Sequence, residues 1–161
     1  MFVRTGGERD LPAVSALIGV SLHATNDVFY GAEMVDQIAK ALYSVAALKV
    51  LIHRPTSEFL VADDGDTVAG VAIAAAAVEN DRAVDILAFF VRPDLQGRGI
   101  GGLLLRELEE SFFESERIRI EVDERNLRAL GFAEAEGYTQ LGQRREEALK
   151  ATLVMLDKSL V

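Results

Sequence analysis

Four glycines fall within six residues in the second half of the chain, in the run Gln96-Gly97-Arg98-Gly99-Ile100-Gly101-Gly102. The residues before this run, 83–91, are apolar like a buried strand, and those after it place Leu104 and Leu108 at helical spacing. A glycine loop that opens a helix presents unpaired N–H groups at the positive end of the helix dipole. We therefore expect residues 96–102 to hold a phosphate group, with Arg98 adding a positive charge.

The same glycines also match the G-x-G-x-x-G pattern of dinucleotide-binding proteins through Gly97, Gly99 and Gly102. Glu121 and Asp123 follow at about the distance expected of a residue that contacts ribose. Two features disfavour this alternative, a dinucleotide-binding oxidoreductase. Five residues separate the strand from the first glycine, and only roughly sixty residues follow the loop, too few for the remaining strand–helix units.

The hydrophobic pattern predicts an α/β (α+β) domain with a mixed sheet in the order β-α-α-β-β-β-α-β-α-β-β. One continuous domain over residues 1–161 is the simplest account, because no linker or repeat interrupts the chain. Helices are expected after Asp10, from near Glu33 to before Pro55, after the glycine loop, and over 126–136. Strands are expected at residues 2–4, 59–62, 67–78, 83–91, 117–122, 138–143 and 152–157.

Composition excludes several classes of function. There is no cysteine and there are only two histidines, so we expect no metal centre. A net charge of −9 and a pI of about 4.7 disfavour binding to nucleic acid or to an anionic membrane. The longest apolar run, 68–78, is about half of a membrane span, and no basic-then-apolar leader opens the chain. A cytoplasmic protein is the default expectation.

The stretch V-x-P-x-x-Q-G-x-G-I-G at residues 91–101 resembles motif A of the GNAT superfamily of acetyl-CoA-dependent N-acetyltransferases. Asn126, Ala129, Gly137 and Tyr138 match the later N-x-x-A…G-[FY] pattern of that superfamily. The resemblance implies a GNAT-like fold with acetyl-CoA as cofactor. It places the pantetheine arm on main chain at Phe89, Phe90 and Val91, and the pyrophosphate on the N–H groups of Gln96, Gly97, Arg98, Gly99, Ile100, Gly101 and Gly102. Asn126 would contact the cofactor, and it is equally a candidate helix N-cap.

Acetylation of a primary amine needs a base, since an amine with a pKa near 10.4 is only about one part in a few thousand neutral at pH 7. Asp85 occupies the strand position where some relatives carry a catalytic Glu, and it would act through water. Glu121 is a second candidate, and Tyr138 is a candidate acid. The usual acid of the family is a Tyr at the position of Ala133 here. A catalytically degenerate CoA-binding module therefore remains an alternative to an active enzyme.

The acceptor side is expected in the segment between the first two helices, residues 22–33, where relatives line the acceptor pocket. Its candidate contacts are His23, Asn26, Asp27 and Tyr30. The implied acceptor is a primary amine of a small molecule or a peptide, and family resemblance allows a homodimer. His53 is given no role.

Overall fold

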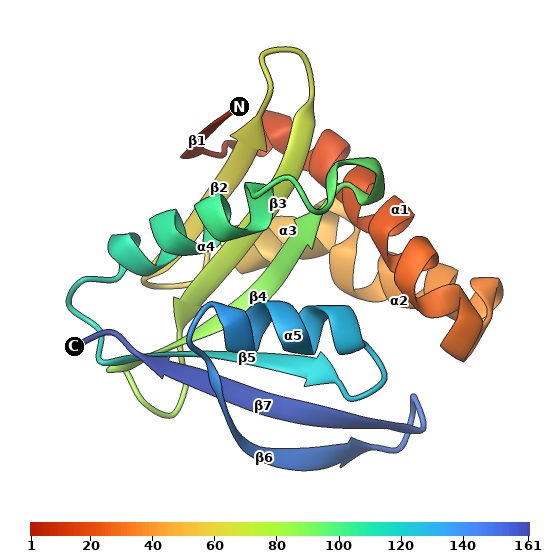
Figure 1. Ribbon diagram of the computed structural model, residues 1–161. Helices are drawn as coiled ribbons and strands as arrows, with labels where there is room; N and C mark the ends of the chain where they lie inside the picture. Colours follow the sequence, from red (N-terminus) through yellow and green to blue (C-terminus); the bar gives the residue numbers. More distant parts are fainter. The chain divides into compact units, whose positions relative to one another are not determined.

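A computed structural model describes residues 1–161 and contains a mixed seven-stranded sheet in the order β1-β2-β3-β4-β5-β7-β6 (Figure 1). The strands are β1 (Phe2–Thr5), β2 (Ser57–Asp63), β3 (Val68–Ala76), β4 (Ala83–Val91), β5 (Arg117–Asp123), β6 (Thr139–Glu146) and β7 (Ala151–Ser159). The helices are α1 (Leu11–Tyr30), α2 (Ala32–Tyr43), α3 (Val45–Ile52), α4 (Ile100–Ser111) and α5 (Leu127–Ala135), with short 3-10 turns η1 (Glu8–Asp10) and η2 (Pro93–Leu95). The predicted mixed sheet is confirmed.

The chain divides into two compact units, which are described separately. Unit 1 comprises residues 1–75 and 87–111, and unit 2 comprises residues 76–86 and 112–161. A single domain over the whole chain stays a prediction.

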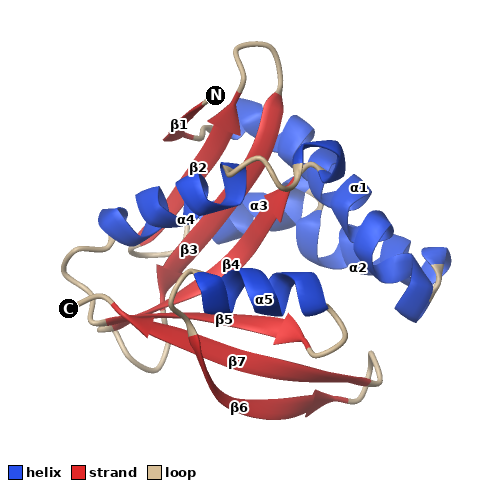
Figure 2. Cartoon of the chain, in the orientation of Figure 1, coloured by secondary structure: helices blue, strands red, loops and turns tan.

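In unit 1, β1 pairs antiparallel with β2, and β2 pairs antiparallel with β3. Figures 1 and 2 show α4 on one side of β2 and β3, with α1 to α3 on the other side. The core between α1 and the strands contains Val14, Ile18, Val61, Val71 and Ile73, all fully buried. The helical spacing of 14 and 18 is the one expected from the sequence, and β3 is buried along almost its whole length, as its apolar run predicts.

Gly70 lets α4 approach β3 closely. A Cβ at this position would lie 2.8 Å from Cδ1 of Leu104 and 3.2 Å from the carbonyl oxygen of Phe90. Because neither distance accommodates a methyl group without movement, glycine is needed here for packing. The N-terminal turn of α4 owes its position partly to this contact.

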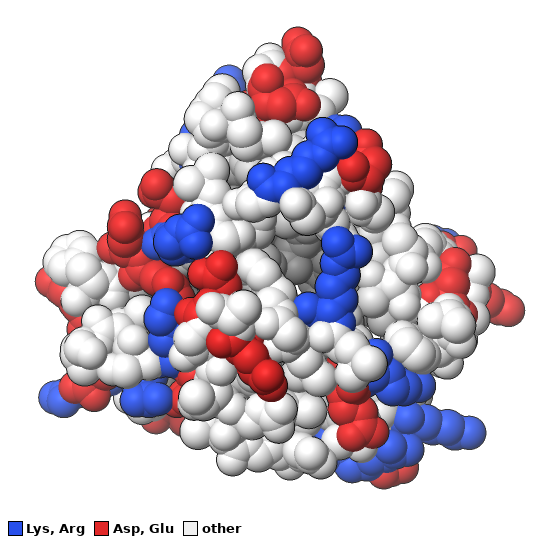
Figure 3. Space-filling model, in the orientation of Figure 1, with Lys and Arg blue, Asp and Glu red and all other residues white.

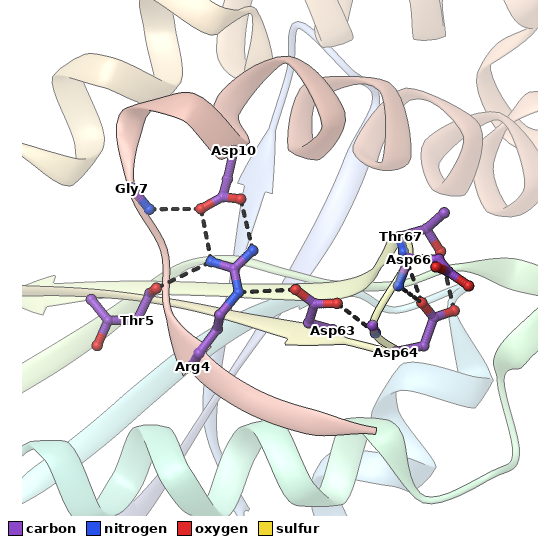
Figure 4. Close-up of polar contacts among 9 residues, drawn as sticks. Arg4, Thr5, Gly7, Asp10, Asp63, Asp64, Asp66 and Thr67 are labelled. Carbon is purple, nitrogen blue, oxygen red and sulfur yellow. Dashed lines mark hydrogen bonds and ion pairs between the residues drawn. The ribbon is translucent and has the colours of Figure 1, made fainter.

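Arg4 joins three segments at the start of unit 1 (Figure 4). Its guanidinium donates to both oxygens of Asp10, at 3.0 and 2.8 Å, and to Asp63 at 3.0 Å. Asp10 also accepts from the N–H of Gly7. Its pKa is lowered to about 2, chiefly by the hydrogen bonds from Arg4. Asp10 precedes α1 as expected, but its side chain makes no capping bond to that helix. It instead stabilises the turn that leads into α1.

Two helix boundaries differ from the sequence prediction. α1 continues to Tyr30 and ends at Gly31, whose φ of 81° only glycine adopts readily. Residues 22–30 are therefore helical and do not form a connecting loop. The second predicted helix is two helices, because Ser44 leaves helical geometry and its Oγ accepts from the N–H of Ala47 at 3.2 Å, which caps α3.

In unit 2, β4 pairs parallel with β5, and β7 lies antiparallel between β5 and β6. One face of these strands is apolar and buried, with Ile118, Val122, Val154 and Leu156 on it. The opposite face carries the charged residues Asp85, Arg117, Arg119, Glu121 and Asp157, which register places in adjacent rows. β6 and β7 extend beyond their predicted ends, and β6 contains an irregularity between Gln140 and Gly142.

No helix of the chain combines the length and apolarity that a membrane crossing requires.

Candidate functional site

The glycine loop of unit 1 lies between β4 and α4, as the sequence predicts. After Val91, the N–H of Arg92 donates to the carbonyl of Ala69 at 2.9 Å, and η2 follows. Gly97 and Gly99 then adopt φ values of 81° and 84°. Side chains are strained at such angles, so glycine is required at these two positions. Gly101 and Gly102 lie within α4 and have no positive φ, so this argument does not apply to them.

The N–H groups from Gly97 to Gly102 have no acceptor within the protein. The first backbone bond of the helix runs from the N–H of Leu103 to the carbonyl of Gly99, at 3.1 Å. No backbone or side-chain oxygen accepts from the six amides before it. A row of unsatisfied donors at a helix N-terminus is a ready anion site. The arrangement can hold a pyrophosphate by main chain alone.

The charges around the loop also favour an anion. No acidic residue occurs between Asp94 and Glu107, and Arg98 is exposed at the centre of the loop. Asp94 is paired with Arg92 at 2.9 Å, which lowers the pKa of Asp94 and compensates its charge. On the face shown in Figure 3, acidic and basic side chains are interspersed. The net charge of −9 therefore does not prevent a local anion site.

The end of β4 is held in place by polar and aromatic contacts. The carbonyl of Val91 accepts from Oγ of Ser21 at 3.4 Å and from Nε2 of Gln96 at 3.3 Å. Phe90 makes an edge-on ring contact with Tyr43, with centroids 5.4 Å apart. The carbonyl of Val91 is thus already engaged, and its expected contact with a pantetheine arm would have to share that oxygen. The main-chain role of Phe89, Phe90 and Val91 stays a prediction.

In unit 2, Asn126 caps α5. Its Oδ1 accepts from the N–H of Ala129 at 3.1 Å, so the N-cap alternative is confirmed. This bond uses only the side-chain oxygen, and the Nδ2 group can still donate to a ligand. Ala133 is 5% exposed near the end of the same helix, and Tyr138 is 2% exposed just beyond it. Tyr138 therefore packs in the core of this unit, and its role as an acid stays a prediction.

Asp85 forms a bidentate ion pair that sequence reasoning missed. Nε of Arg119 lies 2.7 Å from Oδ1 of Asp85, and Nη2 lies 3.0 Å from Oδ2. Arg119 also donates to Glu79, and these contacts, with Asp85 first, raise the arginine's pKa. Asp85 and Arg119 are 34 positions apart in the sequence, and only the β4–β5 register brings them together.

Glu121 is also paired. Its two oxygens accept from Arg144 at 2.6 and 3.3 Å, and Arg144 donates in addition to Glu146. Glu121 is exposed on a face of the sheet, where β7 lies between β5 and β6. Its proposed role near the amine stays a prediction.

The four candidate acceptor residues lie on the last turns of α1. His23 is bound through both ring nitrogens, with Nδ1 2.7 Å from Asp27 and Nε2 2.7 Å from Asp36 of α2. The two carboxylates, Asp27 more than Asp36, raise the pKa of His23. Tyr30 is partly buried against the core, and Asn26 is half-buried. Their placement in a loop was wrong, whereas their acceptor role stays a prediction.

An open groove of about 600 Å³ in unit 1 contains none of these expected residues. It is lined by the Arg4–Asp10–Asp63 group, one face of α1, and the Arg92–Asp94 pair. No group of three or more His, Cys, Asp or Glu side chains is arranged to hold a metal ion.

Comparison with known proteins identifies a family. A family model described as "Acetyltransferase (GNAT) family" matches residues 25–138 of this chain, which is more than half of its length. A search of curated protein sequences gives no match.

Several solved structures share the fold. The PaiA N-acetyltransferase of Thermoplasma acidophilum, in complex with coenzyme A, has a TM-score of 0.87 and 19% identity, with 98% of each chain covered. The ribosomal-protein-S18-alanine N-acetyltransferase of Escherichia coli has a TM-score of 0.73 and 18% identity, covering 99% of this chain and 93% of that one. YncA of Salmonella typhimurium, a putative acetyltransferase with acetyl-CoA, has a TM-score of 0.73 and 18% identity, covering 100% and 94%.

Proposed function

Since the chain belongs to the GNAT acetyltransferase family, we propose that it transfers the acetyl group of acetyl-CoA to a primary amine of a small molecule or a protein. The observation that carries this proposal is the row of unpaired amides from Gly97 to Gly102. These amides, with Arg98, fit the pyrophosphate of coenzyme A in number, sign of charge and helix position. Two structural neighbours crystallised with coenzyme A or acetyl-CoA support the same cofactor.

Each residue of the proposed site has a separate task. When bound, acetyl-CoA supplies the acetyl group as a thioester. The loop amides and Arg98 bind its pyrophosphate, and Asn126 offers its Nδ2 group as a further donor. Asp85 accepts, through a water molecule, the proton that the amine loses as its nitrogen bonds to the acetyl carbon. The leaving thiol has a pKa near 8.5 by analogy with Cys, so it departs readily without an acid at the position of Ala133.

The absence of the family's usual Tyr supports a second candidate function, that of an acyl-CoA-binding protein without turnover. Ala133 is buried and carries no proton donor. Both candidates bind acetyl-CoA, and only the enzyme consumes it. Release of free thiol from acetyl-CoA in the presence of a panel of primary amines separates them. Amine-dependent release identifies the enzyme, while binding without release from any amine identifies the binding protein.

A homodimer, on the basis of the family resemblance, and a cytoplasmic location, as the default expectation from the sequence, complete the proposal. Light scattering of the purified protein would give its mass in solution, and a monomer at all concentrations would contradict the dimer.

A further inference from the structure

Asp85 and Arg119 are direct partners in the parallel pair of β4 and β5. The pairing joins Ala83 to Arg117, Val84 to Ile118 and Asp85 to Arg119, and it ends at this last pair. Partners in a sheet present their side chains on the same face. The strand register alone therefore makes the two side chains neighbours.

The contact is a planar fork against a carboxylate. Both donors of one edge of the guanidinium face the two oxygens of Asp85, at 2.7 and 3.0 Å. Glu79, in the turn between β3 and β4, accepts from Nη2 of the same guanidinium. The side chains of Arg119 and Asp85 are 21% and 32% exposed, so water screens the pair only in part. Such bidentate pairs fix geometry more strictly than a contact with lysine can.

Arg119 leaves part of the carboxylate available. A carboxylate offers about four lone-pair sites, and the fork uses one on each oxygen. Each oxygen of Asp85 retains one site that can accept from a water molecule or an ammonium group. The direction of those remaining sites follows from the plane of the carboxylate, which Arg119 determines.

We propose that Arg119 is a positioning residue for Asp85, holding its carboxylate in the one orientation that accepts the proton of the acceptor amine. This inference rests on the proposed function, because it assigns Arg119 a task in that reaction. Glu79 assists by accepting a second hydrogen bond from Nη2 of the same guanidinium. Arg119 acts through Asp85 and contacts no reacting atom.

Two other arginines of unit 2 provide a contrast. Arg117, on the same face of β5, pairs with Asp157, which is only 3% exposed. Arg82 pairs with Glu116 at 3.0 Å where both side chains are largely exposed. Arg82 is the matched control, since its replacement removes a paired arginine without touching Asp85.

The test is a double-mutant cycle in the full-length protein, with thiol release from acetyl-CoA as the assay. The variants are Arg119→Met, Arg119→Lys, Asp85→Asn, the double variant Arg119→Met/Asp85→Asn, and Arg82→Met as control. Arg119→Met should lower kcat by about 10- to 100-fold through misplacement of Asp85. The KM for acetyl-CoA should change by less than about twofold, because the loop amides are untouched. Arg119→Lys should recover part of the loss, since an ammonium makes one of the two contacts.

Non-additivity decides the assignment. If Arg119 acts only through Asp85, the double variant should be no slower than Asp85→Asn alone, to within about threefold. Multiplicative losses, or an Arg119→Met enzyme as active as Arg82→Met, would overturn the inference while the proposed function stands. If Arg119→Met does not fold, Glu79→Gln replaces it, with an expected loss in kcat of about 2- to 10-fold and none in the double variant with Asp85→Asn.

A second readout does not depend on turnover. In the wild type, the Nε–H proton of Arg119 should give an NMR signal that exchanges slowly with water and is lost in Asp85→Asn. Its absence from the wild type would overturn the inference. A wild type that binds acetyl-CoA yet acetylates no amine would contradict the proposed function, and this inference with it.

Discussion

His23 of α1 and Asp36 of α2 are joined by a hydrogen bond of 2.7 Å, while the other ring nitrogen of His23 lies 2.7 Å from Asp27. A neutral imidazole carries a single N–H and can donate to only one of two carboxylates. Both contacts form fully only when the ring is protonated. The link between the two helices is therefore sensitive to pH, and its carboxylates raise the pKa of His23, Asp27 being the larger cause.

The first prediction concerns the stability that His23 contributes. Its pKa is higher in the folded than in the unfolded chain, so the contribution is complete below the unfolded value of about 6.5. It is lost as the pH rises through the raised value of the folded protein. The difference in Tm between wild type and His23→Gln should be largest near pH 6 and close to zero near pH 9, where each of these pH values is approximate to about one pH unit. Thermal scans across this range measure it.

The remaining histidine provides a clean background for this measurement. His53 is the only other histidine of the chain, so a His53→Gln variant leaves a single imidazole NMR signal. That signal should titrate above the midpoint of a histidine in an unfolded peptide. A midpoint at or below that of the peptide, or a Tm difference that grows with pH, would contradict the assigned contacts.

A second prediction tests the backbone of the glycine loop. Gly99 has a φ of 84° and open space around the position of a Cβ, so Gly99→Ala is resisted by backbone strain and not by a clash. The strain is worth about 1 to 2 kcal/mol. If the loop of the Gly99→Ala variant relieves this strain by reorienting its N–H groups, the variant should bind CoA at least about tenfold more weakly, a loss of about 1.4 kcal/mol. Calorimetric titration with CoA measures this loss.

The matched control is Gly19→Ala in α1, where a Cβ also meets nothing. A helical alanine should stabilise the protein by about 0.5 to 1 kcal/mol and leave CoA binding unchanged. Equal CoA affinity in the Gly99 and Gly19 variants would remove the loop conformation from the account of binding.

A third prediction concerns the charge of the loop. Arg98 is exposed, and its only interaction is a weak electrostatic attraction to Asp94, which is already paired with Arg92, so Arg98→Ala should leave the Tm nearly unchanged. It should weaken CoA binding by about 1 to 3 kcal/mol, the value of one charge-assisted hydrogen bond. The loss should be smaller at high salt, where phosphate contacts are screened. A variant with wild-type affinity at low salt would show that Arg98 points away from the ligand.

A fourth prediction tests the packing of α4 on β3. Gly70→Ala would place a methyl group 2.8 Å from Leu104 and 3.2 Å from the backbone oxygen of Phe90. We expect a loss of about 1 to 3 kcal/mol in the free energy of unfolding, as for other overpacked cores. Urea denaturation measures it. Stability equal to that of the Gly19→Ala variant would mean that α4 does not pack against β3 as described.

Much of the fold could be predicted from the sequence because its signals are local. The apolar strands, the glycine loop and the Asn126 cap all depend on residues that are neighbours in the chain. The boundaries that failed depend on competing local signals. Apolar residues at helical spacing continue through Ser44, and they concealed the cap that begins α3. The polar residues before Gly31 are typical of turns, yet they lie on the exposed turns of α1.

The candidate site, like the fold, could be predicted only where it depends on residues that are neighbours in the sequence. The main-chain donors could be located from the sequence, because Gly97 and Gly99 indicate a loop with positive φ angles before a helix. The partners of Asp85 and His23 could not, because Arg119 and Asp36 meet them only through strand register and helix packing. No spacing rule reports contacts of that kind. Ionised side chains proposed for catalysis from sequence therefore need their long-range partners identified before a role is assigned.

The most direct test of the central claim is the response of the loop amides to coenzyme A. In ¹H–¹⁵N spectra of the labelled protein, addition of CoA should shift the resonances of the amides from Gly97 to Gly102, which have no acceptor in the protein. NAD at the same concentration should leave them in place, because the loop does not follow its strand directly as a dinucleotide-binding turn does. Equal shifts with NAD, or binding of CoA that leaves these six amides unchanged, would contradict the assignment of the loop as the acetyl-CoA site.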